Sequence, residues 1–180
     1  GHAFAKDLVE QIVKMNHGTY LDESLENSAC TDFNIGVAGY PEKHMEAASL
    51  EQDIYHLKKK VEAGADYIVT QMFFDNQKYY DFVEKCRTSG INVPIIPGLK
   101  PITTKSQLSM IPHRFKVDLP NELVIAIAKA KDNKEVKEIG INWCIQQSKD
   151  LMKNGAPVLH YYSMGKSEVV KRIASEVFKD

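Results

Sequence analysis

The sequence predicts an α/β protein built around a parallel β-sheet, on three observations. Short apolar runs typical of buried strands alternate with longer segments of helical periodicity. Alternation of this kind favours parallel βαβ units. Polar residues gather where several of these strands are expected to end, which is where α/β enzymes place functional groups. With 180 residues, 43% hydrophobic and 26% charged, the chain is long enough for one domain with its own core.

The order of the elements follows from hydrophobic periodicity and turn residues. Residues 4–15 have helical spacing, and a polar loop follows to residue 31. Five strand-like runs come next, at residues 34–39, 66–74, 93–99, 115–119 (the weakest) and 158–163. Helical patterns occupy residues 46–63, 77–89, 104–111, 121–131, 135–154 and 166–178. Gly64 and Gly90 fit glycine C-caps before the second and third strands.

Alternation alone does not choose between an open sheet and a closed (β/α)8 barrel. No GxGxxG follows the first strand and no GxxxxGK[ST] occurs, which disfavours Rossmann and P-loop folds. Polar residues instead follow several separate strands, as at the mouth of a TIM barrel; they are residues 40–44, Gln71, Lys100 and Tyr162. A full barrel has eight βα units in roughly 250 residues, and about five units are legible here. We expect residues 1–180 to form a single domain, either a partial TIM barrel lacking the first strands or a smaller fold.

Composition limits the partners and the compartment. The formal net charge is −1, so no global field attracts nucleic acid or an anionic membrane. The longest apolar run, LVIAIA from Leu123, is too short to span a bilayer. Three widely spaced cysteines show no zinc-binding spacing and indicate reduced thiols. The first residues carry no signal-peptide pattern, so a cytoplasmic protein is expected.

The first candidate site combines a loop histidine with one edge of the next helix. His44 lies between the strand at 34–39 and that helix, where it could donate to a phosphate or act as an acid or base. Asp53 and Lys60 are seven residues apart, so at about 100° per residue they point nearly the same way. Together they could bind the hydroxyls and phosphate of a nucleotide-like ligand. On pattern alone, a capping or solvated histidine and a solvated lysine run at 58–60 are the commoner explanations.

Gln71 is the second candidate, because it lies inside an otherwise apolar strand. A buried amide must find partners, and a ligand with paired donors and acceptors or a core network would serve equally well. Gln107 and Lys166 pass as surface residues on pattern alone. No GxSxG, nucleophilic triad or metal-ligand spacing is legible, so no catalytic residue and no metal site is assigned.

Four ordered blocks nevertheless resemble one known family: GVAGYPEKH, DxxxLKKKVEAGADYIVTQMFFD, PIIPGLKPI and HYYSMGK. With AFAKDLVEQI near the start they cover nearly all of the chain, and together they are similar to methylenetetrahydrofolate reductase. The resemblance implies a (β/α)8 barrel that carries FAD at its mouth, in a cytoplasmic enzyme of one-carbon metabolism and methionine biosynthesis. Hydride would pass from NAD(P)H to the flavin and then to 5,10-methylenetetrahydrofolate, giving 5-methyltetrahydrofolate in a ping-pong scheme.

The resemblance also assigns individual residues. The family's FAD-binding positions correspond here to Phe4, Ala5, Tyr40, His44, Met45, Glu46, Ala47, Asp53, His56, Lys59 and Lys60. Its folate-binding positions correspond to Gln71, Gln107 and Lys166. The family usually has an arginine where Lys166 stands. A lysine keeps a charge for the folate's glutamate tail but loses the bidentate fork.

Two functional parts of the family have no counterpart in these residues. They are the glutamate that serves as catalytic acid and an aspartate in an Arg-Gly-Asp loop that tunes the flavin. We therefore expect the isolated chain not to be a competent reductase, and we expect its open strand edges to favour self-association into a homo-oligomer. Two other interpretations stay open: a non-catalytic flavin-binding barrel fragment, and a generic barrel enzyme that uses His44 and Lys60 on a phosphorylated substrate.

Overall fold

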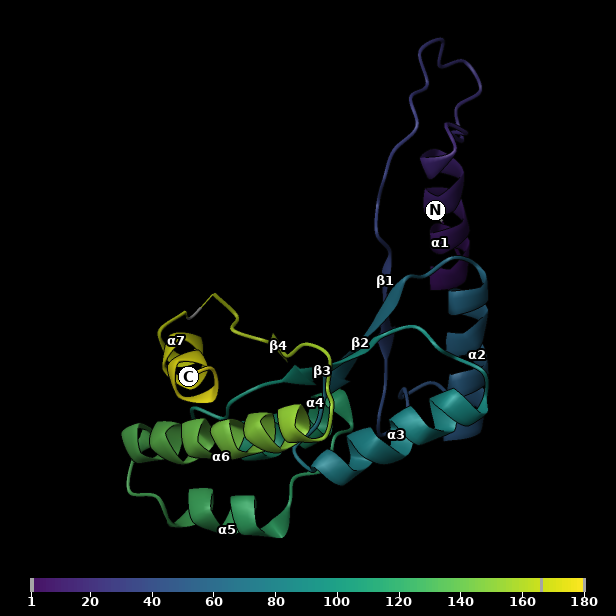
Figure 1. Ribbon diagram of the computed structural model, residues 1–180. Coiled ribbons are helices and arrows are strands. Elements are labelled where there is room, and N and C mark those ends of the chain that lie inside the picture. Colours follow the sequence, from purple (N-terminus) through teal and green to yellow (C-terminus); the bar gives the residue numbers. More distant parts are fainter. Residues whose placement is uncertain (1, 166, 180) are drawn as a thin grey trace.

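The structure, a computed structural model, describes residues 2–165 and 167–179, and its strands form one parallel sheet (Figure 1). In sheet order these are β1 (Gly36–Gly39), β2 (Tyr67–Met72), β3 (Ile95–Leu99) and β4 (His160–Tyr161). The described helices are α1 (Ala5–Asn16), α2 (Leu50–Glu62), α3 (Asn76–Thr88), α4 (Gln107–Phe115), α5 (Asn121–Lys129), α6 (Asn133–Lys153) and α7 (Ser167–Val177). Four parallel strands joined through helices confirm the α/β prediction and fit a partial barrel.

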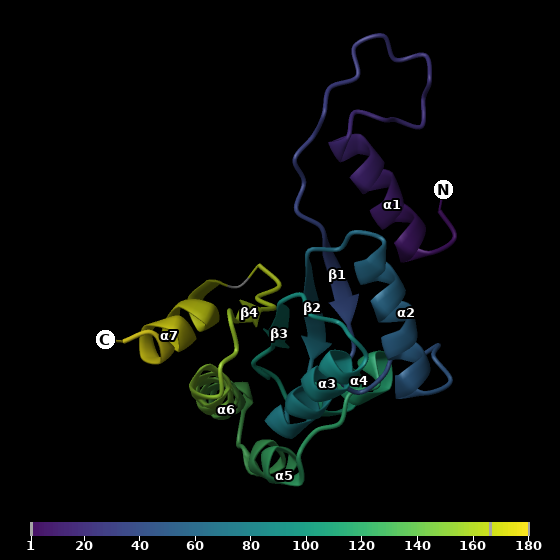
Figure 2. The ribbon, with the colours of Figure 1, turned by 45° about the vertical axis from the view of Figure 1, so that its right-hand side comes forward.

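The two faces of the sheet differ in burial. Val37, Ile68 and Leu99 are buried beneath apolar residues of the surrounding helices α2, α3, α6 and α7 (Figure 2). On the other face Gly36 and Ala38 are exposed, and Gln71 is half-buried. A second core cluster joins Met72 and Phe74 to α4, α5 and the start of α6. The alternation along β1 and β2 therefore places the polar candidates on the uncovered face.

Side-chain caps explain where several helices start. Ser49 accepts from the backbone N–H of Gln52 at the start of α2, and Asp75 does the same for Gln77 at the start of α3. Gly64 and Gly90 follow the ends of these helices at φ 116° and 83°. Because left-handed backbone is easy only for glycine, the predicted glycine stops are confirmed.

The strand predicted at residues 115–119 is wrong. Phe115 is the last residue of α4, and Lys116 ends that helix in a left-handed conformation at φ 55°. Residues 116–120 pair with no strand in the described sheet. The alternation of Phe115, Val117 and Leu119 instead reflects packing against the second core cluster. The described residues thus contain four strands, where the sequence predicted about five units.

Other boundaries moved by a few residues for local reasons. The helix expected from residue 46 starts at Leu50, because residues 44–49 form turns before the Ser49 cap. The helix expected at residues 104–111 spans Gln107–Phe115. Of the strand expected at residues 158–163, only His160 and Tyr161 pair, opposite Gly98 and Leu99.

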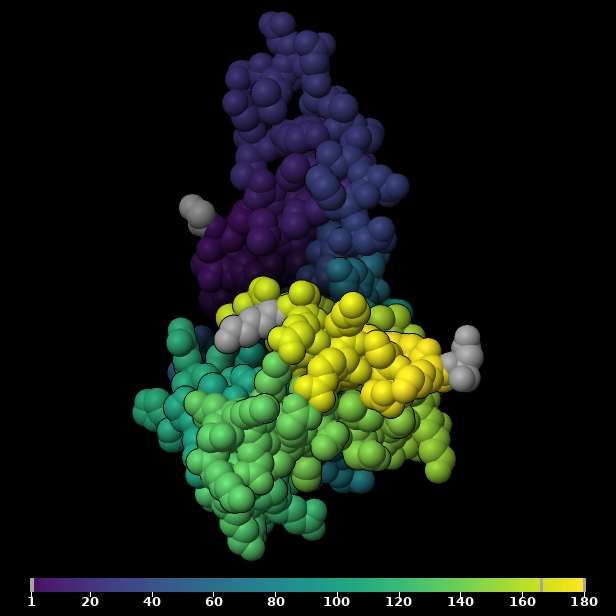
Figure 3. All heavy atoms as spheres, turned by 90° about the vertical axis from the view of Figure 1, so that its left-hand side faces the viewer, coloured from purple at the N-terminus to yellow at the C-terminus, as the bar shows by residue number. Residues whose placement is uncertain are grey.

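The region formed by α1 and the loop at residues 17–34 projects from the rest of the molecule (Figures 1 and 3). Helix α1 is attached through Val9, which is buried, and through Val13, which lies against Gly64. The loop itself is largely exposed. No helix among residues 2–165 and 167–179 has both the length and the apolarity needed to cross a membrane.

Candidate functional site

The loop after β1 is folded tightly by its own backbone. The N–H of Lys43 donates to the carbonyl of Tyr40 at 3.1 Å, and Lys43 has a left-handed φ of 81°. This turn brings the ring of His44 against that of Tyr40, with centroids 4.6 Å apart and planes at 78°. The two residues, predicted separately as flavin contacts, thus form one edge-to-face pair.

Asp53 fixes this loop from the first turn of α2. Its Oδ2 accepts a hydrogen bond of 2.8 Å from the backbone N–H of His44. Bonds to an ionised carboxylate are stronger than neutral ones. Burial raises the pKa of Tyr40, and the negative charges of Asp53 and Glu46 raise it further, so Tyr40 stays a neutral hydroxyl.

Lys60 lies further along α2 than Asp53, and its side chain contacts β1. Its Nζ donates to the carbonyl of Ala38 at 2.8 Å. Burial lowers the pKa of this ammonium, and the charge of Asp53 opposes the effect. An ammonium has three donors, so donors beyond the Ala38 bond remain for a ligand. Asp53 contacts the loop after β1, and Lys60 contacts β1 itself. The prediction that the two side chains lie on one edge of the helix is therefore confirmed.

Met45, Glu46 and Ala47 form the turn that leads into α2. Met45 is exposed, and the N–H of Glu46 donates to His44 Nδ1 at 3.2 Å. The Nζ of Lys43 donates to the carbonyls of His44 and Ala47. The turn therefore continues the Tyr40–His44 unit.

Four other predicted flavin residues lie elsewhere. Lys59 pairs with Glu62 at 2.9 Å and lies over the Tyr55 ring, and His56 is exposed beside the same ring. Phe4 is 73% exposed at the start of α1, and Ala5 follows it. Figures 1 and 2 show α1 beyond the end of α2 that leads into β2, whereas the loop before α2 lies at its opposite end. The structure does not bring Phe4 and Ala5 together with His44.

The predicted folate residues start from different elements. Gln71 projects from the uncovered face of β2, and its Oε1 accepts from the N–H of Met72 at 3.0 Å. Gln107 begins α4, where its Oε1 accepts from the N–H groups of Thr103 and Thr104 at 2.6 and 3.0 Å. These bonds to the loop before α4 explain Gln107 locally without a ligand. Lys166 lies outside the described residues.

Tyr162 was not assigned by sequence reasoning, although it follows a strand. Its hydroxyl donates to the carbonyl of Thr70 at 2.9 Å, and a Cβ on Gly98 would come within 2.7 Å of its ring. Tyr162 therefore lies across the strand ends next to Gln71. The sequence had placed Tyr162 among the polar residues at the strand ends without assigning it a ligand.

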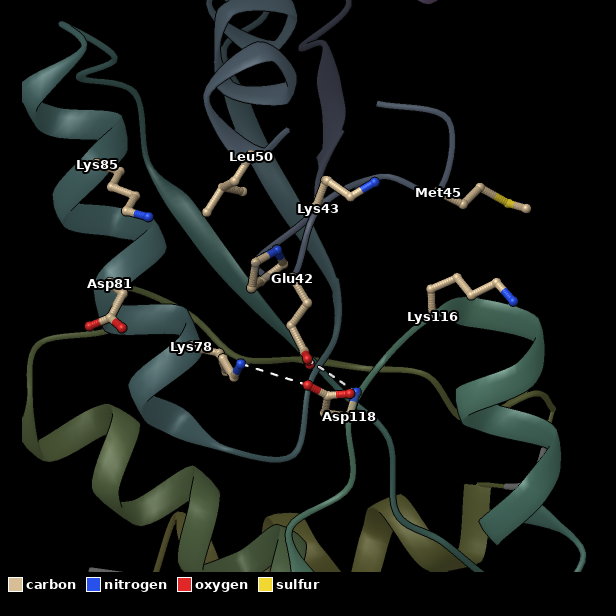
Figure 4. Close-up of a pocket in the computed structure, with 10 residues that line it drawn as sticks. Glu42, Lys43, Met45, Leu50, Lys78, Asp81, Lys85, Lys116 and Asp118 are labelled. Carbon is tan, nitrogen blue, oxygen red and sulfur yellow. Dashed lines mark hydrogen bonds and ion pairs between the residues drawn. The ribbon is translucent and has the colours of Figure 1, made fainter. Parts of the chain in front are cut away.

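Glu42 is a second residue that the assignment left out. Its Oε2 accepts from the backbone N–H of Asp118 at 3.1 Å, and Lys78 approaches the Asp118 carboxylate at 3.8 Å. Figure 4 shows both side chains directed at Asp118 from the β1 loop and from α3, at the edge of a cavity of about 590 Å³. Burial raises the pKa of Glu42 to about 7. No group of three or more metal-ligating side chains occurs in the part of the chain that the structure describes.

Comparison with known proteins identifies the family. A family model described as methylenetetrahydrofolate reductase matches residues 2–177. The chain belongs to the methylenetetrahydrofolate reductase family. It is 38% identical over 174 residues to methylenetetrahydrofolate reductase (NADH) 1 of Arabidopsis thaliana, covering 91% of this chain and 27% of that relative. It is 36% identical over 143 residues to a probable methylenetetrahydrofolate reductase (NADPH) of Caenorhabditis elegans, covering 78% of this chain and 22% of that relative.

A similar fold is also found among solved structures. A Clostridium thermocellum protein described as binding two copies of 5-methyl-5,6,7,8-tetrahydrofolic acid aligns with a TM-score of 0.57 at 20% identity. The alignment covers 81% of this chain and 52% of that protein. At this identity the likeness supports the fold. The chain spans about a quarter of the length of the Arabidopsis reductase, so the activity of the whole protein is a matter of proposal.

Proposed function

We propose that this chain forms part of the active site of a FAD-dependent methylenetetrahydrofolate reductase. The observation that carries the proposal is the convergence of Tyr40, His44, Asp53 and Lys60 at the carboxyl end of β1, in a chain that matches the family along residues 2–177. The relatives are named as reductases that use NADH or NADPH. The reaction we propose is reduction of 5,10-methylenetetrahydrofolate to 5-methyltetrahydrofolate by NAD(P)H, with the two substrates taking turns at the flavin.

The residues at this end of β1 suit FAD. The half-buried ammonium of Lys60 offers donors to phosphate or ribityl oxygens, and the Tyr40–His44 pair offers an apolar edge with polar tips. Ala38 is exposed on the uncovered face of β1, whereas the ring of Tyr67 lies over Gly36 on the same face. When bound, the flavin supplies hydride transfer between the nicotinamide and the folate.

Folate binding is proposed beside Gln71. The side chain of Gln71 lies on the uncovered face of the sheet and uses its oxygen locally, and its amide N–H groups would donate to a ring acceptor of the folate. Lys166 would meet the glutamate tail, as in the family resemblance. We also propose a cytoplasmic homo-oligomer, since β1 and β4 are the two edge strands of the described sheet.

The test is titration of the chain with FAD, followed by flavin fluorescence. Lys60→Met should weaken binding about tenfold, because a charge-assisted bond is lost. Lys58→Met is the matched control: Lys58 is the neighbouring cation on α2, and it approaches Glu62 at 3.9 Å. That variant should stay within about twofold. Failure of the wild-type chain to bind FAD, or equal losses in the two variants, would overturn the flavin assignment.

The same preparation tests the other interpretations. We expect FAD-loaded chain to oxidise NADH far more slowly than a complete reductase, because general acid catalysis contributes about 10²–10⁴-fold and no acid for this role is assigned here. Turnover equal to that of a complete reductase would contradict this expectation. Binding of inorganic phosphate at His44 and Lys60 without any FAD binding would favour a generic barrel enzyme.

A further inference from the structure

The loop that carries Tyr40 and His44 is fastened at a second point, on the side away from Asp53. Glu42 lies between these two residues, and its Oε2 accepts a hydrogen bond from the N–H of Asp118 at 3.1 Å. The partners are 76 positions apart, so this bond joins the β1 loop to the segment that connects α4 to α5. Figure 4 shows the Glu42 side chain reaching from the loop to this segment.

The surroundings of Glu42 are polar but do not neutralise it. Asp118 faces it with its own carboxylate, and Lys78 pairs with that carboxylate at 3.8 Å. The other charged groups lining the cavity come from the loop, α3 and the end of α4, and are Lys43, Asp81, Lys85 and Lys116. The Nζ of Lys43 is used by the carbonyls of His44 and Ala47, and Asp81 accepts from Gln77. Glu42 thus lies half-buried with the Asp118 N–H as its closest polar partner.

We propose that Glu42 is a positioning residue, whose carboxyl group holds the Tyr40–His44 loop in its flavin-binding form by fastening it to the backbone at Asp118. Glu42 acts through the loop and does not itself touch the flavin. This inference rests on the proposed function, since the loop matters for catalysis only if it binds the cofactor. The fastening itself is a property of the protein alone, and it is measurable without a ligand.

Protonation of Glu42 is expected to stabilise the fastened form of the loop, in which Glu42 is bonded to the backbone of Asp118. Burial raises the pKa of Glu42 from 4.5 to about 7 in the fastened form, whereas a loop that released Glu42 into water would return it to its ordinary value. The form with the higher pKa binds the proton more tightly, so acid stabilises it. The fastened population is therefore expected to fall as the pH rises from about 4.5 to about 7 and to level off above that.

Hydrogen exchange at the Asp118 amide tests the fastening directly. After correction for intrinsic exchange, wild-type protection should fall several-fold between about pH 5.5 and about pH 7.5. Glu42→Gln keeps an oxygen acceptor without a titrating group, so its protection should not change over this range. Glu42→Ala should lose protection by about 3- to 10-fold at both pH values. Asp81→Asn, which removes another acid from the same cavity, should behave like wild type.

Flavin affinity supplies the second readout. FAD should bind the wild-type chain several-fold more weakly at about pH 7.5 than at about pH 5.5, and Glu42→Gln should show less of this change. His44 is present in both proteins, so the difference between their profiles belongs to Glu42. Unchanged Asp118 protection in Glu42→Ala would overturn the proposal, and identical pH profiles in wild type and Glu42→Gln would contradict its pH dependence. If no FAD binds at either pH, the proposed function fails, while Asp118 exchange still decides the fastening.

Discussion

The β1–α2 unit and the α1 region both carry residues that the family resemblance assigns to FAD, but the two are held very differently. In the β1–α2 unit, Asp53 binds the backbone of His44 and Lys60 binds the backbone of Ala38. In the α1 region, Phe4 is 73% exposed, and the loop at residues 17–34 is held largely by local bonds such as that between Asp22 and Ser24. The first region is held by polar contacts between elements, whereas the second is attached to the rest of the molecule by the apolar contacts of Val9 and Val13.

This difference indicates which contacts hold the side chains of a binding site in place before a ligand binds. The charged groups of α2 act on β1 and its loop because a strand, a turn and a helix form one packed unit, with Ile54 and Leu57 buried between them. Helix α1 is attached to the same core through Val9 and Val13, but Phe4 at its start is exposed and contacts no such unit. Three predictions test the contrast, in order of expected size.

The largest difference between the two regions is expected in the loss of stability when a leucine is truncated to alanine. Leu57→Ala removes a fully packed side chain that is 3% exposed, and it should lower the free energy of unfolding by about 2–5 kcal/mol. Leu8→Ala, at a side chain that is 48% exposed on α1, should cost less than about 0.5 kcal/mol. Urea unfolding followed by circular dichroism measures both. Similar losses would mean that the exposed face of α1 contributes as much to stability as the core beneath α2.

The second-largest difference is expected in FAD affinity, between a variant of the β1–α2 unit and a variant of the α1 region. Asp53→Ala leaves the His44 N–H without its acceptor and frees the loop, so FAD affinity should fall about tenfold. Phe4→Ala should leave the affinity within about twofold, because Phe4 begins α1, which lies at the opposite end of α2 from the β1 loop. Fluorescence titration of both variants, after their folding is checked by circular dichroism, gives the comparison. An equal loss in Phe4→Ala would show that α1 joins the site when FAD binds.

The smallest effect is expected inside the exposed loop. The hydroxyl and N–H of Ser24 donate to Asp22 and lower the pKa of its carboxyl below the ordinary 3.8. Ser24→Ala should raise the pKa of Asp22 toward its ordinary value without changing the urea midpoint. An NMR titration of the Asp22 side chain measures the first effect. A shift in the midpoint would show that this local bond is coupled to the rest of the fold.

Much of the fold was predictable because its signals are local. The stops at Gly64 and Gly90 depend on backbone that only glycine adopts easily, and the strand at β2 shows as a long apolar run. The strand prediction at residues 115–119 failed for a physical reason. The alternation of Phe115, Val117 and Leu119 reflects their burial, and these residues are buried against helices. Alternation does not say whether a strand partner exists.

The candidate site was predictable only in part. The seven-residue spacing of Asp53 and Lys60 put them on one helical edge, and the structure shows that edge facing β1. Glu42 and Tyr162 escaped assignment because each contacts a residue far away in the chain, at Asp118 and Thr70. Gln107, assigned to folate by resemblance, accepts hydrogen bonds from the loop that precedes its own helix.

By itself the sequence determined the α/β class, the family, the helix stops and the shared edge of Asp53 and Lys60, since these follow from periodicity, from glycine backbone and from ordered motifs. Only the tertiary structure decided that the β1 loop is held from two sides, by Asp53 and by the Glu42–Asp118 bond. It also decided that Phe4 lies apart from that loop. The physical reason is that contacts between distant residues depend on how helices and strands pack against one another. The spacing of residues along the chain does not specify this packing.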